Sequence, residues 1–175
     1  MKWKLIIATL TLVTIAGGAW FTAWANTPDR PLTATVQPIQ QPEPTPQPPT
    51  VDELLRLVNE ERAKAGVAPL RVDERVQRSA QLKATDMYTN NYASHIMPST
   101  GKVLNAEMNA LLADACIYSS ENYVDNDRYN NTTAEAMNAW INSKPHHTAM
   151  TDARYESTGI GVSGDKIVQH LCDEQ

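Results

Sequence analysis

The sequence lacks the surplus of positive charge that nucleic-acid binding requires. It carries 15 Lys and Arg residues against 20 Asp and Glu residues, for a formal net charge of −5. Phosphate binding depends on a basic surface, so we expect no nucleic-acid partner. The chain is also short. Its 175 residues suffice for one hydrophobic core, because a domain takes about 100 to 200 residues, and this excludes an α/β barrel or a two-domain enzyme.

Charge is absent from most of the N-terminal segment. Lys2 and Lys4 are followed by a run without a charged residue from Leu5 to Ala25, which is typical of an export signal. Residues 1–25 are predicted to be either a signal peptide cleaved after Ala25 or an N-terminal membrane anchor, since such a run can also span about 30 Å of hydrocarbon. The two lysines keep the N-terminus in the cytoplasm. The rest of the chain is therefore expected to be extracellular, either secreted or anchored to the outer face of the cytoplasmic membrane.

Apolar residues are scarce in the next segment, residues 26–50, which holds most of the 11 prolines of the chain. Such a sequence cannot form a core and favours extended polyproline II structure. We predict a proline-rich linker here that holds a globular domain, residues 51–175, away from a membrane or wall.

Only two cysteines are present, Cys116 and Cys172. Because the chain is predicted to be exported into oxidising surroundings, we expect a disulfide between them. In the chain-entropy model a bridge of this span stabilises the fold by about 4 kcal/mol. Neither cysteine lies in a motif of a catalytic thiol.

Helical and strand periodicities alternate within the domain. Capping residues and apolar spacings of three and four predict helices, and runs with a period of two predict strands. The expected helices cover 50–66, 73–90 and 105–114 and begin again at Thr132, and the expected strands cover 116–124, 156–163 and 166–172. Gly164-Asp165 separates the last two strands as a hairpin turn. The predicted class is α+β, with helices flanking a small sheet.

Imidazole chemistry is limited to four histidines. His95, Glu121 and His146 each lie at the edge of an expected element, where a loop could turn them into one cleft. Two imidazoles and a carboxylate can bind zinc and leave a position open for water. Spacing alone does not establish such a site, and it favours the plainer interpretation that His146 and His147 are exposed at a helix start and that Glu121 caps or hydrogen-bonds backbone.

A serine-type arrangement can be drawn from Ser143, His146 and Glu121, since residues i and i+3 share a helix face. The sequence has no G-x-S-x-G elbow, and a serine beside a histidine is commonly an ordinary helix-end contact. A serine nucleophile is therefore not expected.

The order of these motifs resembles the bacterial-type CAP domain, the superfamily of cysteine-rich secretory, antigen 5 and pathogenesis-related 1 proteins, also called SCP-like. The resemblance covers residues 51–171 and rests on a collinear set of short motifs. These are Leu57-Val58-Asn59 with Arg62 and Gly66, Pro69-Leu70, Asp86-Met87, Ser94-His95, Glu121-Asn122, Ala139-Trp140, Ser143 with His146, and Thr158-Gly159-Ile160-Gly161-Val162.

This resemblance implies an α-β-α sandwich with a cleft that carries two histidines and two acidic residues. His95, Glu121 and His146 match three of the four positions, and Ser143 stands where the second glutamate is expected. The resemblance therefore implies a cleft of His95, Glu121, Ser143 and His146. The resemblance further implies that His95, Glu121 and His146 are metal ligands, with zinc as the metal. His147 is given no ligand role.

Three functions remain open. The first is a noncatalytic, exported CAP-domain protein that presents this cleft to an external ligand or a cell-surface partner. The second is a zinc-dependent, peptidase-like hydrolase that uses His95, Glu121 and His146, although no acidic residue except Asp114 or Asp125 is available as its general base. The third is a lipid or sterol carrier, which requires an apolar groove beside residues 105–114.

Overall fold

Five α-helices and one four-stranded sheet form the part of the chain that the structure describes. The structure is a computed structural model, and it describes residues 47–128 and 131–175. The helices are α1 (Val51–Lys64), α2 (Glu74–Thr89), α3 (Ala106–Ala115), α4 (Thr133–Ile141) and α5 (Lys144–Met150). The strands are β1 (Arg71–Val72), β2 (Cys116–Asp125), β3 (Ser157–Ser163) and β4 (Lys166–Glu174).

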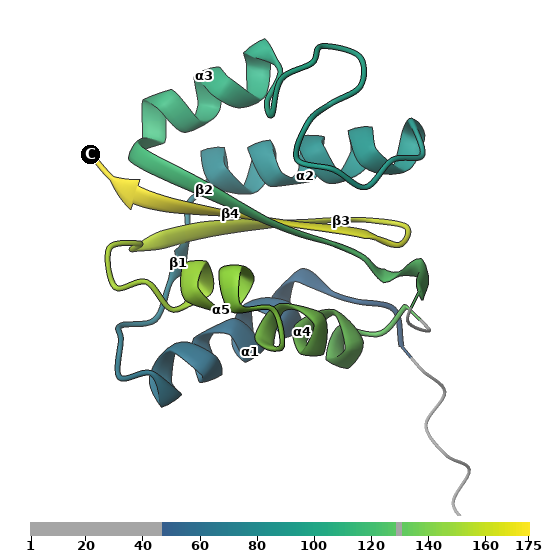
Figure 1. Cartoon of the computed structure of the whole chain (residues 1–175). Helices are drawn as coiled ribbons and strands as arrows, with labels where there is room; N and C mark the ends of the chain where they lie inside the picture. Colours follow the sequence, from purple (N-terminus) through teal and green to yellow (C-terminus); the bar gives the residue numbers. More distant parts are fainter. Residues whose placement is uncertain (1–46, 129–130) are drawn as a thin grey trace, which may run out of the picture. The chain divides into compact units, whose positions relative to one another are not determined.

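The sheet is mixed and has the order β1-β3-β4-β2, with β1 parallel to β3 and the other pairs antiparallel. Helices α2 and α3 cover one face, and α1, α4 and α5 cover the other (Figure 1). The predicted α+β class and its three-layer α-β-α arrangement are confirmed. The predicted leader and residues 26–46 of the predicted linker lie outside the described residues. Among the described residues, no helix has both the length and the apolar character to cross a membrane.

Side-chain caps fix the starts of the predicted helices. Thr50, Asp73, Asn105 and Thr132 each accept a backbone N–H of the first turn that follows, which satisfies donors that have no partner inside a helix. The expected helix starts are confirmed within one residue. The hairpin of β3 and β4 is confirmed as well, with Gly164 in the left-handed conformation at φ +57°.

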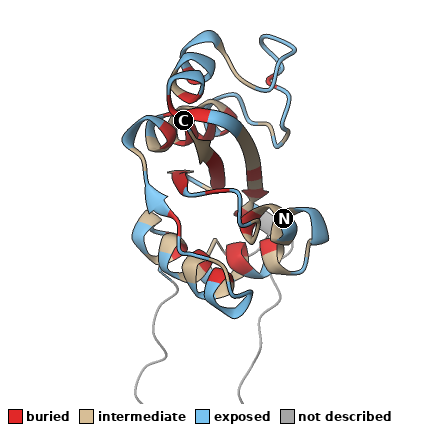
Figure 2. Ribbon diagram, turned by 90° about the vertical axis from the view of Figure 1, so that its left-hand side faces the viewer, coloured by how far each residue is buried: buried red, intermediate tan, exposed pale blue. Residues whose placement is uncertain are grey.

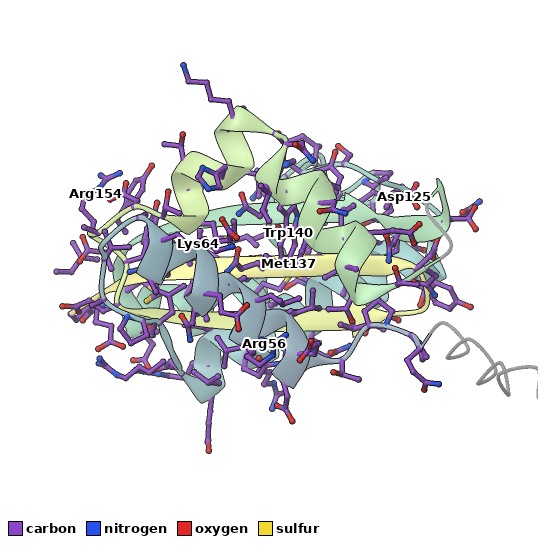
Figure 3. The ribbon with its side chains drawn as sticks, turned by 90° about the horizontal axis from the view of Figure 1, so that it is seen from below. Arg56, Lys64, Asp125, Met137, Trp140 and Arg154 are labelled. Atoms are coloured by element: carbon purple, nitrogen blue, oxygen red, sulfur yellow. A yellow bond between two sulfur atoms is a disulfide. The ribbon has the colours of Figure 1, made fainter. Side chains whose placement is uncertain are left out.

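The larger core lies between the sheet and the layer of α1, α4 and α5. Buried residues line the inner surfaces of both helical layers (Figure 2). Seen from below, Trp140 and Met137 lie between α1 and α4 over the middle of the sheet (Figure 3). Trp140 is completely buried, so this core holds α4, and with it the start of α5, against the sheet.

Arg62 is a buried cation of α1 that binds only backbone oxygens. Its guanidinium donates hydrogen bonds to the carbonyls of Ala68, Met150, Asp152 and Tyr155. Burial lowers the pKa of Arg62, while the charge of Asp152 acts in the opposite direction. The bond to Ala68 holds the loop after α1, and the other three tie the end of α1 to the last residue of α5 and the chain that follows it.

The other face depends on a very close approach of α2 to β3. A Cβ atom added at Gly159 would lie 2.2 Å from the backbone nitrogen of Gln77, and one at Gly161 would lie 2.3 Å from the carbonyl oxygen of Ala80. The side chain of Gln77 accepts from the backbone N–H of Ile160 and donates to its carbonyl. Only glycine allows this contact, which explains the two glycines of the Thr158–Val162 motif.

Cys116 and Cys172 form the predicted disulfide, with their Cα atoms 5.4 Å apart. The bond joins the first residue of β2 to the end of β4 and packs against Val76 of α2. It therefore reinforces the end of the β2–β4 ladder on the side of α2.

Replacing Gly161 by alanine should destabilise the protein strongly, because the new methyl group meets backbone rather than a movable side chain. We expect a loss of about 3 kcal/mol, the upper part of the usual cost of overpacking. Urea unfolding of Gly161→Ala and of the control Ser163→Ala, which lies two positions later in β3, measures the difference. Equal stability of the two variants would show that α2 does not need the glycine.

Candidate functional site

Glu121, in the middle of β2, is held by two imidazoles. Its Oε1 lies 2.7 Å from Nδ1 of His95, and its Oε2 lies 3.0 Å from Nε2 of His170. The Glu121 side chain is 7% exposed, His170 is 1% exposed, and the His95 side chain is 48% exposed. A buried carboxylate thus connects a buried histidine to one at the surface.

The protonation states of this group follow from its contacts. Burial acts to raise the pKa of Glu121, but hydrogen bonds from His170 and His95 and the charge of Lys83 outweigh burial and hold this pKa below its ordinary value. An ionised carboxylate only accepts hydrogen bonds, so Nδ1 of His95 and Nε2 of His170 both donate. Nδ1 of His170 is buried and has no partner among the described residues, which suits a bare lone pair better than an N–H group.

His95 lies in the loop after α2, and Lys83 of α2 holds this loop. The fully buried ammonium of Lys83 donates to the backbone carbonyl of His95 at 2.5 Å and to that of Val103 at 3.0 Å. Burial lowers the pKa of Lys83, and the charges of Glu121 and Asp86 oppose that effect. With Nδ1 bound to Glu121, His95 presents Nε2 away from the carboxylate.

His146 comes from the opposite layer, in the first turn of α5. Its backbone carbonyl accepts from the side chain of Asn122, which also donates to Gln169. The ring of Tyr123 lies edge-on between the two imidazoles, with centroids 4.7 Å from His95 and 6.5 Å from His146. Burial, and then the charge of His95, lower the pKa of His146 from its ordinary value, which favours the neutral imidazole.

A cavity of about 420 Å³ opens at the same place. It lies beside the last residues of β2 and is lined by Ala93, Tyr123, Val124, Asp125, Ala139, Trp140, Ser143 and His146. We call it the edge cavity, because β2 is the outer strand of the sheet. Its volume falls in the range of about 300 to 1,000 Å³ that is usual for small-ligand sites.

The structure thus brings His95 and Glu121 into direct contact and places Ser143 and His146 together on the wall of the edge cavity. Ser143 precedes α5 at its N-cap position and makes no side-chain cap bond. His147 points elsewhere, with Nε2 3.8 Å from the carboxylate of Glu61 in α1.

Sequence reasoning missed His170 and Lys83. His170 faces Glu121 because β2 and β4 pair in the register Glu121↔His170, and this register cannot be read from either strand alone. Lys83 was overlooked because a lysine in an amphipathic helix usually faces water. The available signal was the spacing of Lys83, which falls on the same helix face as the buried residues Ala80, Ala84 and Met87.

The residues as arranged do not offer zinc three free donors. Both oxygens of Glu121 already accept hydrogen bonds from imidazoles, so a metal at Glu121 would have to use the lone pairs that these bonds leave. Among residues 47–128 and 131–175, no group of three or more His, Cys, Asp or Glu side chains is placed to hold a metal ion. Zinc binding by His95, Glu121 and His146 stays a prediction.

The family model described as "Cysteine-rich secretory protein family", CAP, matches residues 55–171. Two relatives from Bacillus subtilis (strain 168) are similar in sequence. The uncharacterized protein YkwD is 29% identical over 109 residues, which are 62% of this chain and 40% of that protein. The uncharacterized membrane protein YlbC is 30% identical over 121 residues, which are 68% of this chain and 33% of that protein. The chain therefore spans well under half of the length of either relative.

Solved structures share the fold. A crystal structure of an extracellular protein that contains an SCP domain, from Bacillus anthracis, matches 71% of this chain and 40% of its own with a TM-score of 0.63 and 21% identity. An outer surface protein of Borrelia burgdorferi matches 75% of this chain and 100% of its own with a TM-score of 0.59 and 15% identity. A cysteine-rich secretory protein of Staphylococcus aureus matches with a TM-score of 0.55 and 16% identity, over 71% of this chain and 38% of its own.

Replacing Glu121 by glutamine should remove a pH-dependent part of the stability. The folded-state pKa of Glu121 lies below 4.5, so its contribution is complete above about pH 4.5 and is lost as the pH falls through the folded value. We expect Glu121→Gln to cost about 1.5 to 3 kcal/mol at pH 7, the usual range for a hydrogen bond to a charged group. The difference from the wild type should shrink below pH 4.5.

Urea unfolding of both proteins between pH 3 and pH 8 measures this difference, with Glu107→Gln as the control. Glu107 is exposed and paired with Arg78 on the surface, where an ion pair contributes about 0 to 1 kcal/mol. A difference between Glu121→Gln and the wild type that stays constant over the whole pH range would contradict the ionised, doubly bound carboxylate.

Proposed function

The chain belongs to the cysteine-rich secretory protein (CAP) family, and from this membership we propose that it is an extracellular, noncatalytic binding protein. Its cleft, formed by His95, Glu121, Ser143 and His146 beside the edge cavity, holds an external ligand or a cell-surface partner. The observation that carries the proposal is the doubly bound carboxylate of Glu121, because it gives the cleft a fixed shape and charge and leaves no free carboxylate there.

The extracellular location is supported by the leader sequence and by the relatives. Residues 5–25 contain no charge and follow two lysines, as export signals do. Among the proteins of the same fold, one is described as extracellular and another as an outer surface protein, and one sequence relative is described as a membrane protein. Secretion and anchoring by the leader are both compatible with this support.

Binding is favoured over hydrolysis by the state of the acidic residues. A general base must be free to take up a proton near neutral pH, whereas Glu121 is ionised and accepts from two imidazoles. The two other candidates are also engaged. Asp114 is paired with Arg75, and Asp125 is paired with Lys166. The zinc-dependent hydrolase therefore has no unpaired carboxylate among these three residues to act as its general base.

A lipid carrier requires an apolar groove beside α3. Met108 and Leu112 of that helix are buried in the protein interior, and the hollow next to Leu111 is also lined by Arg78, Glu107, Ala110 and Asp114. Charged side chains at such a rim do not favour acyl chains or sterols, so this hollow does not support the lipid proposal.

We expect the protein not to retain zinc tightly. The free donors at the site are Nε2 of His95 and the imidazole of His146, one ligand fewer than catalytic zinc sites use. Full-length protein loaded with zinc, passed over a desalting column and analysed for metal should contain well under one zinc per chain. One zinc per chain, lost in both His95→Ala and Glu121→Ala, would contradict this expectation and support the hydrolase.

The binding function is tested on intact cells of the source organism. Labelled full-length protein should bind them saturably, and His146→Ala should weaken this binding at least tenfold, because it removes one wall of the edge cavity. Glu107→Ala is the matched control, since it carries the same leader and linker and is altered only on the surface of α3. Equal binding by all three proteins would refute a role of the cleft in recognising a cell-surface partner.

A further inference from the structure

The strand that carries Glu121 is the outer strand of the sheet. β2 pairs with β4 on one side, and no strand of the described residues lies on its other side. In such a strand, alternate residues direct their N–H and C=O groups away from the sheet. These groups can pair with a further strand.

β2 also lacks most of the features that usually protect such an edge, and its inward-pointing Glu121 already accepts hydrogen bonds from two imidazoles. Natural edge strands are shortened or carry proline, lysine or bulges that block pairing. β2 is 10 residues long, Cys-Ile-Tyr-Ser-Ser-Glu-Asn-Tyr-Val-Asp, without proline, lysine, arginine or glycine. Its one register irregularity lies at its start, between Cys116 and Tyr118. The stretch from Tyr118 to Asp125 is thus a regular edge.

An aromatic surface lies at the start of this edge. The ring of Tyr118, which is 54% exposed, stacks on Tyr155 with centroids 6.4 Å apart and an interplanar angle of 13°. The guanidinium of Arg154 lies 5.5 Å from the Tyr118 ring and 5.8 Å from the Tyr155 ring. We call Tyr118, Tyr155 and Arg154 the aromatic platform. It is held by contacts within the chain and is therefore preformed.

The edge cavity lies at the other end of the same strand. Figure 3 shows Arg154, which marks the platform, and Asp125, which lines the cavity, at opposite ends of the molecule. Tyr118 and Val124 are an even number of residues apart, so their side chains lie on the same face of the sheet. The distance between them is about 20 Å at roughly 3.3 Å per residue.

We propose that the outer edge of β2 binds an extended polypeptide segment of a partner, which adds to the sheet as a fifth strand. Main-chain hydrogen bonds to β2 supply affinity that does not depend on sequence. One apolar side chain of the segment packs on the aromatic platform, and another on the same face enters the edge cavity. The proposal rests on the proposed function, because it names the ligand class of that cleft.

A polypeptide is favoured over a small molecule by the extent of the surface. The edge cavity alone suits a small ligand, but it does not account for the unprotected edge or for the platform at the far end of β2. A second copy of this chain is the other possible strand. Tyr118 is engaged with Tyr155 and Arg154 of its own chain, so it forms a surface for an incoming side chain rather than an anchor that projects into a neighbour.

The test begins with selection of random linear peptides of about twelve residues, longer than the roughly 20 Å edge requires, on the full-length protein. The strongest binder is synthesised with single N-methyl groups at each backbone nitrogen in turn. Strand addition predicts that every second N-methyl group weakens binding about tenfold or more and that the intervening ones do not, because only alternate N–H groups face β2.

Two pairs of variants locate the bound peptide. Tyr118→Ala should weaken binding about tenfold, as expected for a central aromatic contact, whereas Tyr88→Ala, which removes an equally exposed tyrosine of α2, should not. Ala139→Phe should block the edge cavity, whereas Ala113→Phe, on the exposed side of α3, should not. Circular dichroism confirms that each variant is folded before its affinity is compared.

The outcomes separate this proposal from the proposed function. Peptides that bind without the alternating N-methyl effect but respond to Ala139→Phe would overturn strand addition and leave the cleft function standing. The alternating effect without any response to Ala139→Phe or His146→Ala would support strand addition to β2, but it would contradict entry of a side chain into the edge cavity and, with it, the cleft function. Failure to select any peptide, or a dimer of the full-length protein that Tyr118→Ala abolishes, would overturn the proposal.

Discussion

The close approach of α2 to β3 at Gly159 and Gly161 is the constraint on which the candidate site depends. Backbone meets backbone there, at separations that leave no room for a Cβ atom. Gly159 lies opposite His170 on β4, and His170 lies opposite Glu121 on β2. Gly159, His170 and Glu121 therefore lie side by side in one row across the sheet, which links the contact between α2 and β3 to the carboxylate of Glu121. A shift of α2 would also move Lys83, which holds the backbone of His95.

The site therefore combines two rigid layers around a sheet edge. His95 and the contacts that fix Glu121 lie on the α2 side of the sheet. His146 lies in the opposite layer, and its backbone carbonyl accepts a hydrogen bond from Asn122 of β2. Binding sites built on rigid elements keep their geometry without a ligand. This preformed shape agrees with recognition of an external partner, because little conformational entropy is lost when the partner binds.

Much of the fold was predictable from local signals. The caps at Thr50, Asp73 and Thr132 and the apolar spacings that follow them marked the helices, and Gly164-Asp165 marked the hairpin. β1 was not predicted, because its two residues are too few to show alternation. Export and the presence of a single possible pair identified the disulfide. The predicted leader lies outside the described residues, so its fate stays a prediction.

The site was predictable only in part, for a physical reason. His95, Glu121 and His146 were found through their order along the chain. His170 reaches Glu121 only because of the register between β2 and β4, and Lys83 contributes by binding the backbone of the loop that carries His95. Both contacts depend on tertiary packing, which local sequence patterns do not encode. The register also explains why Glu121 is not free. Its second oxygen is occupied by a residue 49 positions later in the sequence.

The central claim is that an ionised Glu121 accepts hydrogen bonds from both His95 and His170. Long-range ¹H–¹⁵N correlation spectra of the imidazole rings at neutral pH test it most directly, because they distinguish the two tautomers of each histidine. The account predicts that His95 carries its proton on Nδ1 and His170 on Nε2. His170 protonated on Nδ1 alone, or His95 on Nε2 alone, would contradict it, since Glu121 would then lack one of its two donors.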